Sequence, residues 1–508
     1  MALLPFLHCL LVGQAAGNRL PAEMDLDLTP WEFEADPGGV GVAEQWFSVT
    51  AKPTLSRTIR TPGAWQAQGV GNETALETHQ FIGVGWYRKT VQLDLHSDST
   101  SAGPADSCCS VWLWIGGAPG GVMRSAKVWA NGVLVGRHVG YLEPLELSLT
   151  AAIAAPGAAG KVVLAVAVDS RWNRTEDPLW GGGSMWNPGG IGPGGFGGDG
   201  YSFGGYGGIV GNVKLLLRQR AWIADSVHPS CANAGGGTWR CSISFTVAGS
   251  THASDHVNLT VCEWNSGSGS GSARQPLPAC VTATADVAAA AAAGTRHTLS
   301  VLIPQARLWV PGTSAAHANL YVANLTLCGA DGLAAARATR FGVRSLSTNG
   351  PRILFNGEPL FLRGYGDDGQ YWTSGAPPME KAYYLSQLAE MKTLGWNFIR
   401  FHTHSMPDVF HEAADELGFL CDPEFAMSYS YPNPFGSPAS AAIKAVFNRS
   451  FASVVQRRSH HPSVFGYVLS NEVHWGSAGD PQFAELYRYR LHPLIIETTF
   501  LKHLELPS

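Results

Sequence analysis

Residues 395–424 read GWNFIRFHTHSMPDVFHEAADELGFLCDPE, and this stretch decides the fold class. Two short apolar runs, Asn397 to Phe401 and Phe419 to Asp422, have the length of buried strands. Between them, apolar residues recur on one helical face and a glycine follows as terminator: Phe410, Ala413, Ala414, Leu417 and then Gly418. The stretch therefore predicts a strand, a helix and a parallel strand.

The same alternation extends to both sides. Leu360 to Arg363 and Val464 to Leu469 are further strand candidates. Two more helical faces are formed by Tyr384, Leu388 and Met391, with Leu385 beside them and Gly395 after them, and by Ile443, Phe447, Phe451 and Val454. Four strands with helices between them make the N-terminal half of a (β/α)8 barrel, which we assign to residues 345–508.

Residues 20–344 have a different pattern, with short β-rich runs broken by Gly, Pro and Asn. Examples are Trp86 to Val91, Val111 to Ile115, Ala126 to Trp129, Lys161 to Val168, Ser242 to Val247, His256 to Val261 and Ala318 to Leu327. Asn131-Gly132 is a two-residue hairpin signal, because both residues accept positive φ. We expect a jelly-roll sandwich over 20–218 and an immunoglobulin-like sandwich over 219–344.

Glycine dominates residues 181–208, which we interpret as an insertion in the first sandwich. Its interleaved Trp, Phe and Tyr rings offer the alternative of sugar contact, but glycine positions such rings poorly. Residues 288–294 are a second low-complexity loop.

The composition is that of a folded protein, since only 14% of the 508 residues are charged and 10% are aromatic. A net charge of −5 gives no reason to expect nucleic-acid binding. Residues 1–17 resemble a secretory signal peptide without its basic start, and no later stretch has the length of a membrane span. We expect a secreted, vacuolar or lysosomal protein that is not bound to a membrane.

Two further features concern this compartment. N-glycosylation sequons begin at Asn72, Asn173, Asn258, Asn324 and Asn448. Eight cysteines follow Cys9, and Cys231 with Cys241 and Cys262 with Cys280 are plausible local disulfides. The alternative is that several of them are free buried thiols.

Polar side chains follow each of the four predicted parallel strands, at the end where barrel enzymes carry their functional groups. They are Asp367 and Asp368 after the first strand, Arg400, His402 and His404 after the second, Asp422 and Glu424 after the third, and Asn471 and Glu472 after the fourth. The four clusters predict one acidic, histidine-bearing site.

Several segments resemble glycoside hydrolase family 2, the group of β-galactosidases, β-glucuronidases and β-mannosidases. The segments are GVGWYRKTVQL (83–93), KVWANGVLVGRHVGYLEP (127–144), GGIVGNVKL (207–215), FGVRSL (341–346), ILFNGEPLFLRGY (353–365), residues 395–424, and RSHHPSVFGYVLSNE (458–472). The last two are the most specific. The resemblance implies a jelly roll, an immunoglobulin-like sandwich and a barrel, and a retaining β-glycosidase acting on a β-linked galactoside, glucuronide or mannoside.

By this resemblance Glu472 is the acid/base carboxylate and Asn471 contacts the sugar. Such a group protonates the glycosidic oxygen and then deprotonates water. Trp475 offers a stacking surface beside it. The alternative is a surface Glu at the start of a helix.

The remaining candidates are assigned by chemistry. Arg400 can orient carboxylates by bidentate pairing. His402 and His404 are either substrate contacts or structural residues, because the family pattern places its histidine three residues after the Arg and this chain has them at two and four. Glu424 corresponds to a magnesium ligand of some relatives, but the accompanying His is missing, so we expect no metal and no cofactor.

The resemblance also raises a difficulty. The nucleophile of the family is a Glu at the end of the seventh barrel strand, whereas only Asp480, Glu485, Glu497 and Glu505 follow Glu472. We therefore expect a truncated chain. The alternative is a non-catalytic, lectin-like protein with a vestigial barrel, and further βα units encoded downstream of Ser508 would favour the enzyme. The oligomeric state is not readable from the sequence.

Purified 1–508 is expected not to hydrolyse nitrophenyl glycosides, since a retaining mechanism needs two carboxyl groups roughly 5 to 5.5 Å apart. Nitrophenol release measures this directly. Turnover at the rate of a complete glycosidase would contradict the expectation.

Overall fold

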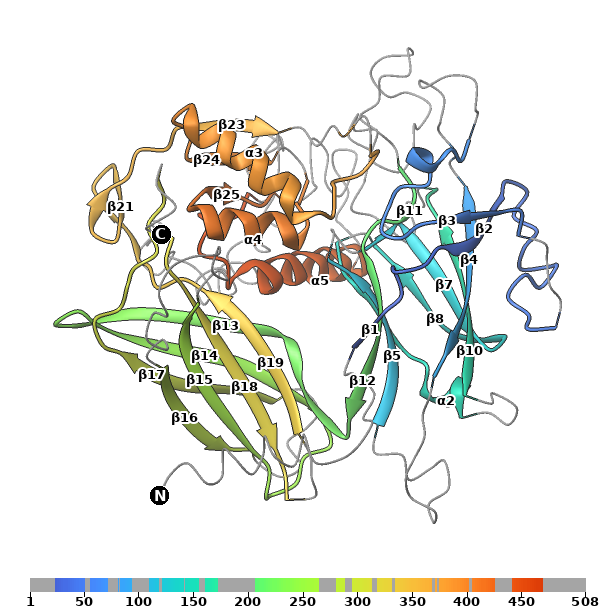
Figure 1. The fold of residues 1–508 in the computed structure, drawn as a ribbon, viewed down its shortest axis with the longest axis horizontal. Coiled ribbons are helices and arrows are strands. Elements are labelled where there is room, and N and C mark those ends of the chain that lie inside the picture. Colours follow the sequence, from blue (N-terminus) through green and yellow to red (C-terminus); the bar gives the residue numbers. More distant parts are fainter. Residues whose placement is uncertain are drawn as a thin grey trace, which may run out of the picture.

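The computed structural model describes most of the chain between residues 23 and 468 (Figure 1). The described residues are 23–50, 55–71, 81, 83–93, 109–117, 121–140, 142–154, 160–171, 206–264, 280–287, 295–312, 318–330, 334–367, 371, 374–401, 404–424 and 441–468. The predicted signal peptide, residues 181–205 of the predicted insertion, the 288–294 loop and the sequons at Asn72 and Asn173 lie outside them. So do five site candidates: Asp368, His402, Asn471, Glu472 and Trp475.

The first part of the chain forms two facing antiparallel sheets with one core between them. The four-stranded sheet has the order β1 (Glu23–Asp25), β12 (Asn212–Gln219), β5 (Cys109–Gly116) and β9 (Leu145–Ser148). The six-stranded sheet has the order β3 (Arg57–Ile59), β2 (Trp31–Asp36), β4 (Val84–Gln92), β10 (Lys161–Asp169), β7 (Ser125–Ala130) and β8 (Val133–Val139). A short pair, β11 (Gly208–Ile209) with β6 (Val122–Met123), and two single turns, η1 (Gln66–Gln68) and α2 (Thr150–Ile153), complete this sandwich.

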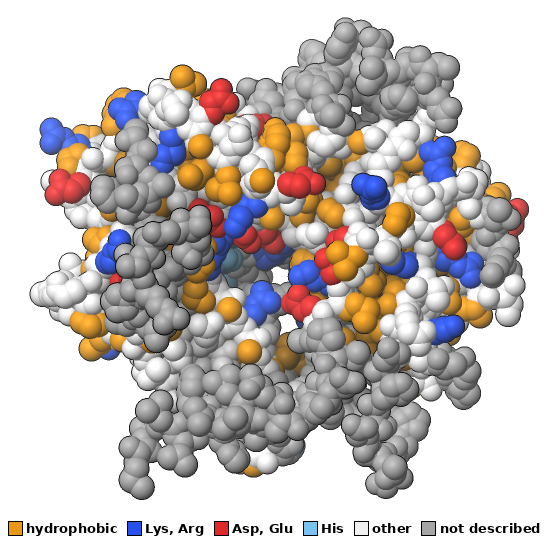
Figure 2. All heavy atoms as spheres, viewed as in Figure 1, with side chains coloured by type: hydrophobic (Ala, Val, Ile, Leu, Met, Phe, Trp, Pro, Cys, Tyr) orange, Lys and Arg blue, Asp and Glu red, His pale blue; other side chains and the backbone are white. Residues whose placement is uncertain are grey.

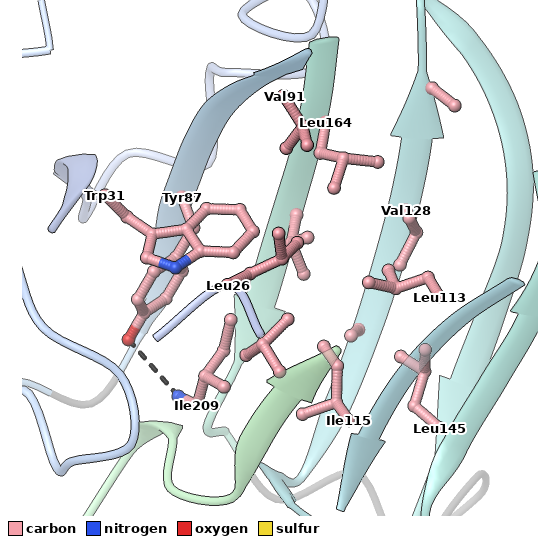
Figure 3. Packing of buried hydrophobic residues seen from close by; sticks show 14 of the residues in the cluster. Leu26, Trp31, Tyr87, Val91, Leu113, Ile115, Val128, Leu145, Leu164 and Ile209 are labelled. Atoms are coloured by element: carbon pink, nitrogen blue, oxygen red, sulfur yellow. Dashed lines mark hydrogen bonds between the residues drawn. The ribbon is translucent and has the colours of Figure 1, made fainter. Parts of the chain in front are cut away.

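Aliphatic side chains and a few large aromatic ones fill the core of this sandwich (Figure 3). Trp31 packs edge-on against Tyr87, and the Tyr87 hydroxyl accepts a hydrogen bond from the Ile209 amide at 3.2 Å. The backbone at Gly207 and Gly208 lies directly against this core, and a Cβ on Gly207 would be only 2.2 Å from the Trp65 ring. Residues 206–208, predicted as the end of the glycine-rich insertion, are therefore packed parts of the sandwich.

A second apolar cluster lies on the other side of the six-stranded sheet. Trp86 and Trp129 stack at 5.1 Å there, and Phe47 stacks on Trp129 at 5.0 Å. The segment after β2 covers this cluster. The Asp36 carboxylate fixes the segment by accepting hydrogen bonds from the Gly41 amide and from Trp86 Nε1. Both faces of the central strands are consequently buried, which explains their nearly continuous apolar sequence.

Asn131 and Gly132 have φ values of 49° and 81°, as the predicted two-residue hairpin between β7 and β8 requires. The Asn131 side chain also accepts from the Val163 amide and so ties the turn to β10. The hairpin prediction is confirmed.

The second sandwich begins directly after β12. One sheet has the order β13 (Ala221–Gly235), β14 (Thr238–Gly249) and β17 (Thr295–Ile303), and the other has the order β16 (Cys280–Asp286), β15 (His256–Trp264), β18 (Leu320–Cys328) and β19 (Ala334–Phe341). Alternate residues of each strand face the shared core, for example Cys241, Ile243 and Phe245. Cys231–Cys241 and Cys262–Cys280 are disulfide-bonded across neighbouring strands, which confirms the predicted local pairs.

A small antiparallel sheet of β20 (Leu346–Asn349), β21 (Arg352–Phe355) and β22 (Glu358–Pro359) leads into the last part. There β23 (Gly364–Asp367), β24 (Phe398–Phe401) and β25 (Leu420–Asp422) pair in parallel, and single parallel bridges join Cys421 to Val464 and Glu424 to Val468. The helices α3 (Lys381–Thr393), α4 (Asp408–Leu417) and α5 (Ala441–Arg458) accompany these strands (Figure 1).

The three predicted helices are confirmed, including both glycine terminators. Gly395 and Gly418 follow α3 and α4 with φ of 84° and 68°, and the Gly418 amide donates to the Ala414 carbonyl. The predicted strands at 397–401 and 419–422 are confirmed as well, and the parallel bridges at Val464 and Val468 lie within the predicted fourth strand.

The predicted strand at Leu360 to Arg363 is wrong by four residues. Leu360 still belongs to the preceding hairpin, because its amide donates to the Ile353 carbonyl. The parallel strand begins at Gly364, where a Cβ would lie 2.5 Å from the Phe398 ring. Only glycine fits this close to Phe398. The strand therefore lacks the run of apolar residues by which the other parallel strands were predicted.

Among the described residues no helix has the length and apolar character needed to cross a bilayer. On the face shown in Figure 2, acidic and basic side chains are intermingled and no continuous basic surface is visible.

Candidate active site

The site candidates lie at the ends of the parallel strands, on the side to which the strands run. Ile399, Phe401, Cys421 and Val464 pack into the apolar cluster formed with α3 and α4. Because side chains alternate along a strand, Arg400 and Asp422 lie on the opposite face, and the register pairs these two residues directly. The face away from the helices thus carries the charges.

Arg400 and Glu424 form an ion pair at the centre of this edge. Arg400 Nε donates to Glu424 Oε2 at 2.9 Å, and the Glu424 side chain is fully buried whereas that of Arg400 is 41% exposed. Glu424 Oε1 has no hydrogen-bond partner among the described residues. A buried carboxylate with one paired and one open oxygen is a ready acceptor for a hydroxyl or a water molecule.

The backbone of Glu424 is held as well. The Ser405 hydroxyl donates to the Glu424 carbonyl at 3.1 Å, and this serine lies in the segment that connects β24 to α4. The loop after one strand is therefore attached to the end of the next, which fixes the spacing of the two strand ends.

Asp367 and His404 come together from two strand ends. His404 Nε2 lies 3.9 Å from Asp367 Oδ1, which is too long for a hydrogen bond but close enough for attraction if the imidazole is protonated. The His404 ring also lies edge-on to Phe401 at 5.4 Å. Of the nine candidates, the structure places Asp367, Arg400, His404 and Glu424 at one edge, and the other five lie outside the described residues.

Asp422 is a further ionisable group of the site, which the sequence analysis placed in the third cluster without assigning it a role. Burial raises its pKa from 3.8 to about 7, and the nearby Glu424 acts in the same direction. The Gly466 amide and Arg400 act in the opposite direction. The clue in the sequence was the two-residue spacing in Asp422-Pro423-Glu424, which puts both carboxyl groups on one face of the strand.

A buried network supports the fourth strand. Asp415 of α4 accepts from His461 Nδ1 at 2.6 Å and from the Ser463 amide at 3.0 Å, and its backbone carbonyl accepts from Trp309 Nε1 at 2.8 Å. Asp415 and His461 are 1% and 5% exposed. These contacts fix the turn that delivers Val464 beside Cys421.

A second network joins α4 to α5 and to the first sandwich. Asp408 pairs with Arg457 at 2.9 Å and with Arg458, and these cations hold the pKa of its carboxyl well below the ordinary value against the opposing effect of burial. The Asp408 amide donates to the Gly117 carbonyl of the sandwich at 2.7 Å. Glu143 of the same sandwich accepts from Arg449 and Ser450 of α5. The helices behind the parallel strands are therefore hydrogen-bonded to both sandwiches, to the second through Asp415 and to the first through Asp408 and α5.

Among the described residues no group of three or more His, Cys, Asp or Glu side chains is placed to hold a metal ion.

Comparisons with known proteins point to one family. The chain is 24% identical to a β-glucuronidase of Paenibacillus borealis over 459 residues, which is 87% of this chain and 66% of that protein. A glycosyl hydrolase family 2 member from Bacteroides cellulosilyticus has the same fold with a TM-score of 0.66 at 15% identity, covering 94% of this chain and 56% of that one. The chain is therefore similar in sequence to a β-glucuronidase and in fold to a member of glycoside hydrolase family 2.

A second solved structure with a similar fold is the β-glucuronidase from Ruminococcus gnavus, with a TM-score of 0.68 at 18% identity over 95% of this chain and 73% of that one. No family profile matches the chain. The chain spans just under two thirds of the length of the Paenibacillus relative.

Asp422→Asn is expected to stabilise the protein more at pH 8 than at pH 5. The folded protein binds the Asp422 proton more tightly than the unfolded chain does, so the stability present below about pH 4 is lost as the pH rises towards 7. Asparagine mimics the protonated carboxyl and removes that loss. Thermal unfolding at both pH values measures the difference.

The control is Glu390→Gln on the exposed face of α3, whose effect should be equally small at both pH values. An Asp422→Asn variant that destabilises the protein equally at pH 5 and pH 8 would contradict the assigned burial.

Asp415→Ala is expected to lower the free energy of unfolding by roughly 3 to 5 kcal/mol, because it leaves a buried histidine and a buried amide without their acceptor. Glu412→Ala on the same helix removes two partly exposed pairs, with Arg340 at 3.5 Å and with Lys381 at 3.8 Å, and should cost less than about 1 kcal/mol. Urea unfolding of both variants tests this. Equal midpoints would show that the Asp415 network does not support the fold.

Proposed function

We propose that this chain carries the acid/base half of a retaining β-glycosidase site, with β-glucuronides as the first substrate class to test. One observation carries the proposal: in a relative of family 2, four parallel segments bring Asp367, Arg400, His404 and Glu424 to the same edge. The Paenibacillus and Ruminococcus relatives are named β-glucuronidases, and the latter was solved in complex with an N1-substituted uronic isofagomine.

In the proposed architecture the parallel strands belong to a (β/α)8 barrel that begins near residue 345. The first two units are a jelly roll over 20–218 and an immunoglobulin-like sandwich over 219–344. This division is supported by the change of sheet between β12, which ends at Gln219, and β13, which begins at Ala221. The hairpin of β20 and β21 then separates the second sandwich from the parallel strands.

Glu472 is the proposed proton donor. The last described bridge, Glu424 with Val468, lies four residues before it. This spacing supports a position for Asn471 and Glu472 just beyond the end of the fourth strand, next to the Arg400–Glu424 pair. In the proposed reaction the Glu472 carboxyl protonates the departing glycosidic oxygen and later removes a proton from the attacking water.

The described residues then have supporting roles. Arg400 holds Glu424 by a hydrogen bond to Oε2, and the open oxygen Oε1 accepts a hydrogen bond from a sugar hydroxyl. His404 and Asp367 contribute a second polar pair from the neighbouring strand ends. His402 and Trp475 complete the proposed sugar contacts. The relatives found are hydrolases, and nothing in them favours a lectin-like protein.

The test is hydrolysis by the product of the complete gene, measured with aryl β-glucuronide, β-galactoside and β-mannoside. Glu472→Gln should slow hydrolysis of a substrate with a poor leaving group by roughly 10²- to 10⁴-fold, the usual contribution of general acid catalysis. A substrate whose leaving group needs no protonation should be cleaved at a rate much closer to that of the unsubstituted protein.

Glu390→Gln serves as the matched control, because this exposed carboxylate of α3 should leave both rates unchanged. The proposal fails if Glu472→Gln slows both substrates equally little. It also fails if none of the three glycosides is hydrolysed by the unsubstituted gene product.

A further inference from the structure

Two of the predicted sequons lie side by side on one sheet of the second sandwich. Asn258-Leu259-Thr260 is in β15 and Asn324-Leu325-Thr326 is in β18, and the antiparallel register pairs Asn258 with Thr326 and Thr260 with Asn324. Leu259 and Leu325 are fully buried in the core. By alternation, both asparagines and both threonines lie on the outer face of the sheet.

This outer face is polar but nearly uncharged in its middle. Thr282 and Thr284 of β16 and Ala336 and Ala338 of β19 surround the two sequons, and all four are exposed. Charged residues appear only towards the ends, at Asp286 and Arg340. Sheets of this kind normally carry charges that prevent association through their edges, and here β16 and β19 are the edges.

The two asparagines differ in their surroundings. The Asn258 amide is engaged, since the Thr284 hydroxyl donates to its Oδ1 at 2.8 Å and its Nδ2 points at Cys328 Sγ, 3.9 Å away. Asn324 is exposed and lies between Thr260 on one strand and the small Ala338 on the other. Asn324 is thus the more exposed of the two, since Asn258 is half-buried.

We propose that Asn324 carries an N-linked glycan and that Asn258 is left unmodified. In the reaction a bond forms between Asn324 Nδ2 and C1 of the first sugar, and the bond from C1 to phosphate of a polyprenyl-diphosphate-linked oligosaccharide breaks. The amide loses one proton and the lipid diphosphate leaves. The donor belongs to the secretory pathway, as does the oxidising environment in which disulfides form and persist.

The disulfides provide the independent evidence for that pathway. Cys231–Cys241 and Cys262–Cys280 both lie in the sandwich that carries the sequon, and Cys262 is opposite Val322, two residues from Asn324. A glycan attached to Asn258 would displace the contacts to Thr284 and Cys328, so chains modified there would fold less well. A glycan on Asn324 would stand over the uncharged face and shield the β19 edge.

The experiment is site-resolved mass spectrometry of the full chain produced in a eukaryotic cell with its own N-terminus. Peptides are treated with an amidase that releases N-glycans and converts the glycosylated asparagine to aspartate in heavy-oxygen water. We expect the label at Asn324 and an unlabelled Asn258. Recovery of unmodified Asn324 peptide, from cells or medium, overturns the proposal, and so does a labelled Asn258.

Variants separate the glycan from the side chain itself. Asn324→Gln and Thr326→Ala should each remove one glycan from the intact mass, whereas Thr326→Ser keeps the sequon and should keep the glycan. Asn258→Gln is the matched control and should leave the glycan number unchanged. Loss of a glycan in Asn258→Gln, or retention of all glycans in Thr326→Ala, would assign the modification elsewhere.

Discussion

The buried carboxylate of Asp415 is the interaction on which the rest of the parallel sheet depends. A buried charge is tolerated only when its hydrogen-bonding capacity is filled, and here His461 and the Ser463 amide fill it from the segment that follows α5. Trp309 of the second sandwich bonds to the carbonyl of the same residue. Asp415 of α4 therefore fixes the position at which the fourth parallel segment begins. It also joins α4 to the second sandwich.

This arrangement explains how charges from distant segments reach one edge. Once the turn before Val464 is fixed, the bridge to Cys421 fixes the register, and the bridge from Val468 to Glu424 follows. Arg400 is opposite Asp422 because the parallel register of β24 and β25 pairs these two positions. The Asp408 pairs with Arg457 and Arg458 brace the helices behind these strands.

Helical periodicity was sufficient to predict α3, α4 and α5, and short apolar runs were sufficient to predict β24 and β25. These signals failed at β23, where Gly364 packs on Phe398 and the strand carries no apolar run. The Asp415 network was also beyond prediction, although the motif containing His461 was noticed, because the two residues are 46 positions apart. Sequence spacing predicts which face a residue occupies, whereas the partner of a buried charge is decided by the tertiary fold.

Asp422 and Glu424, at the end of β25, interact with the same cation, Arg400, in different ways. Arg400 is hydrogen-bonded to Glu424 and acts on Asp422 only through its charge, so burial dominates at Asp422 and raises its pKa to about 7. A carboxyl group whose pKa lies near 7 is suited to proton transfer near neutral pH. A ligand that brings a second negative charge to Arg400 would weaken its effect on Asp422 and raise that pKa further, whereas a neutral sugar hydroxyl at Glu424 Oε1 would leave it nearly unchanged.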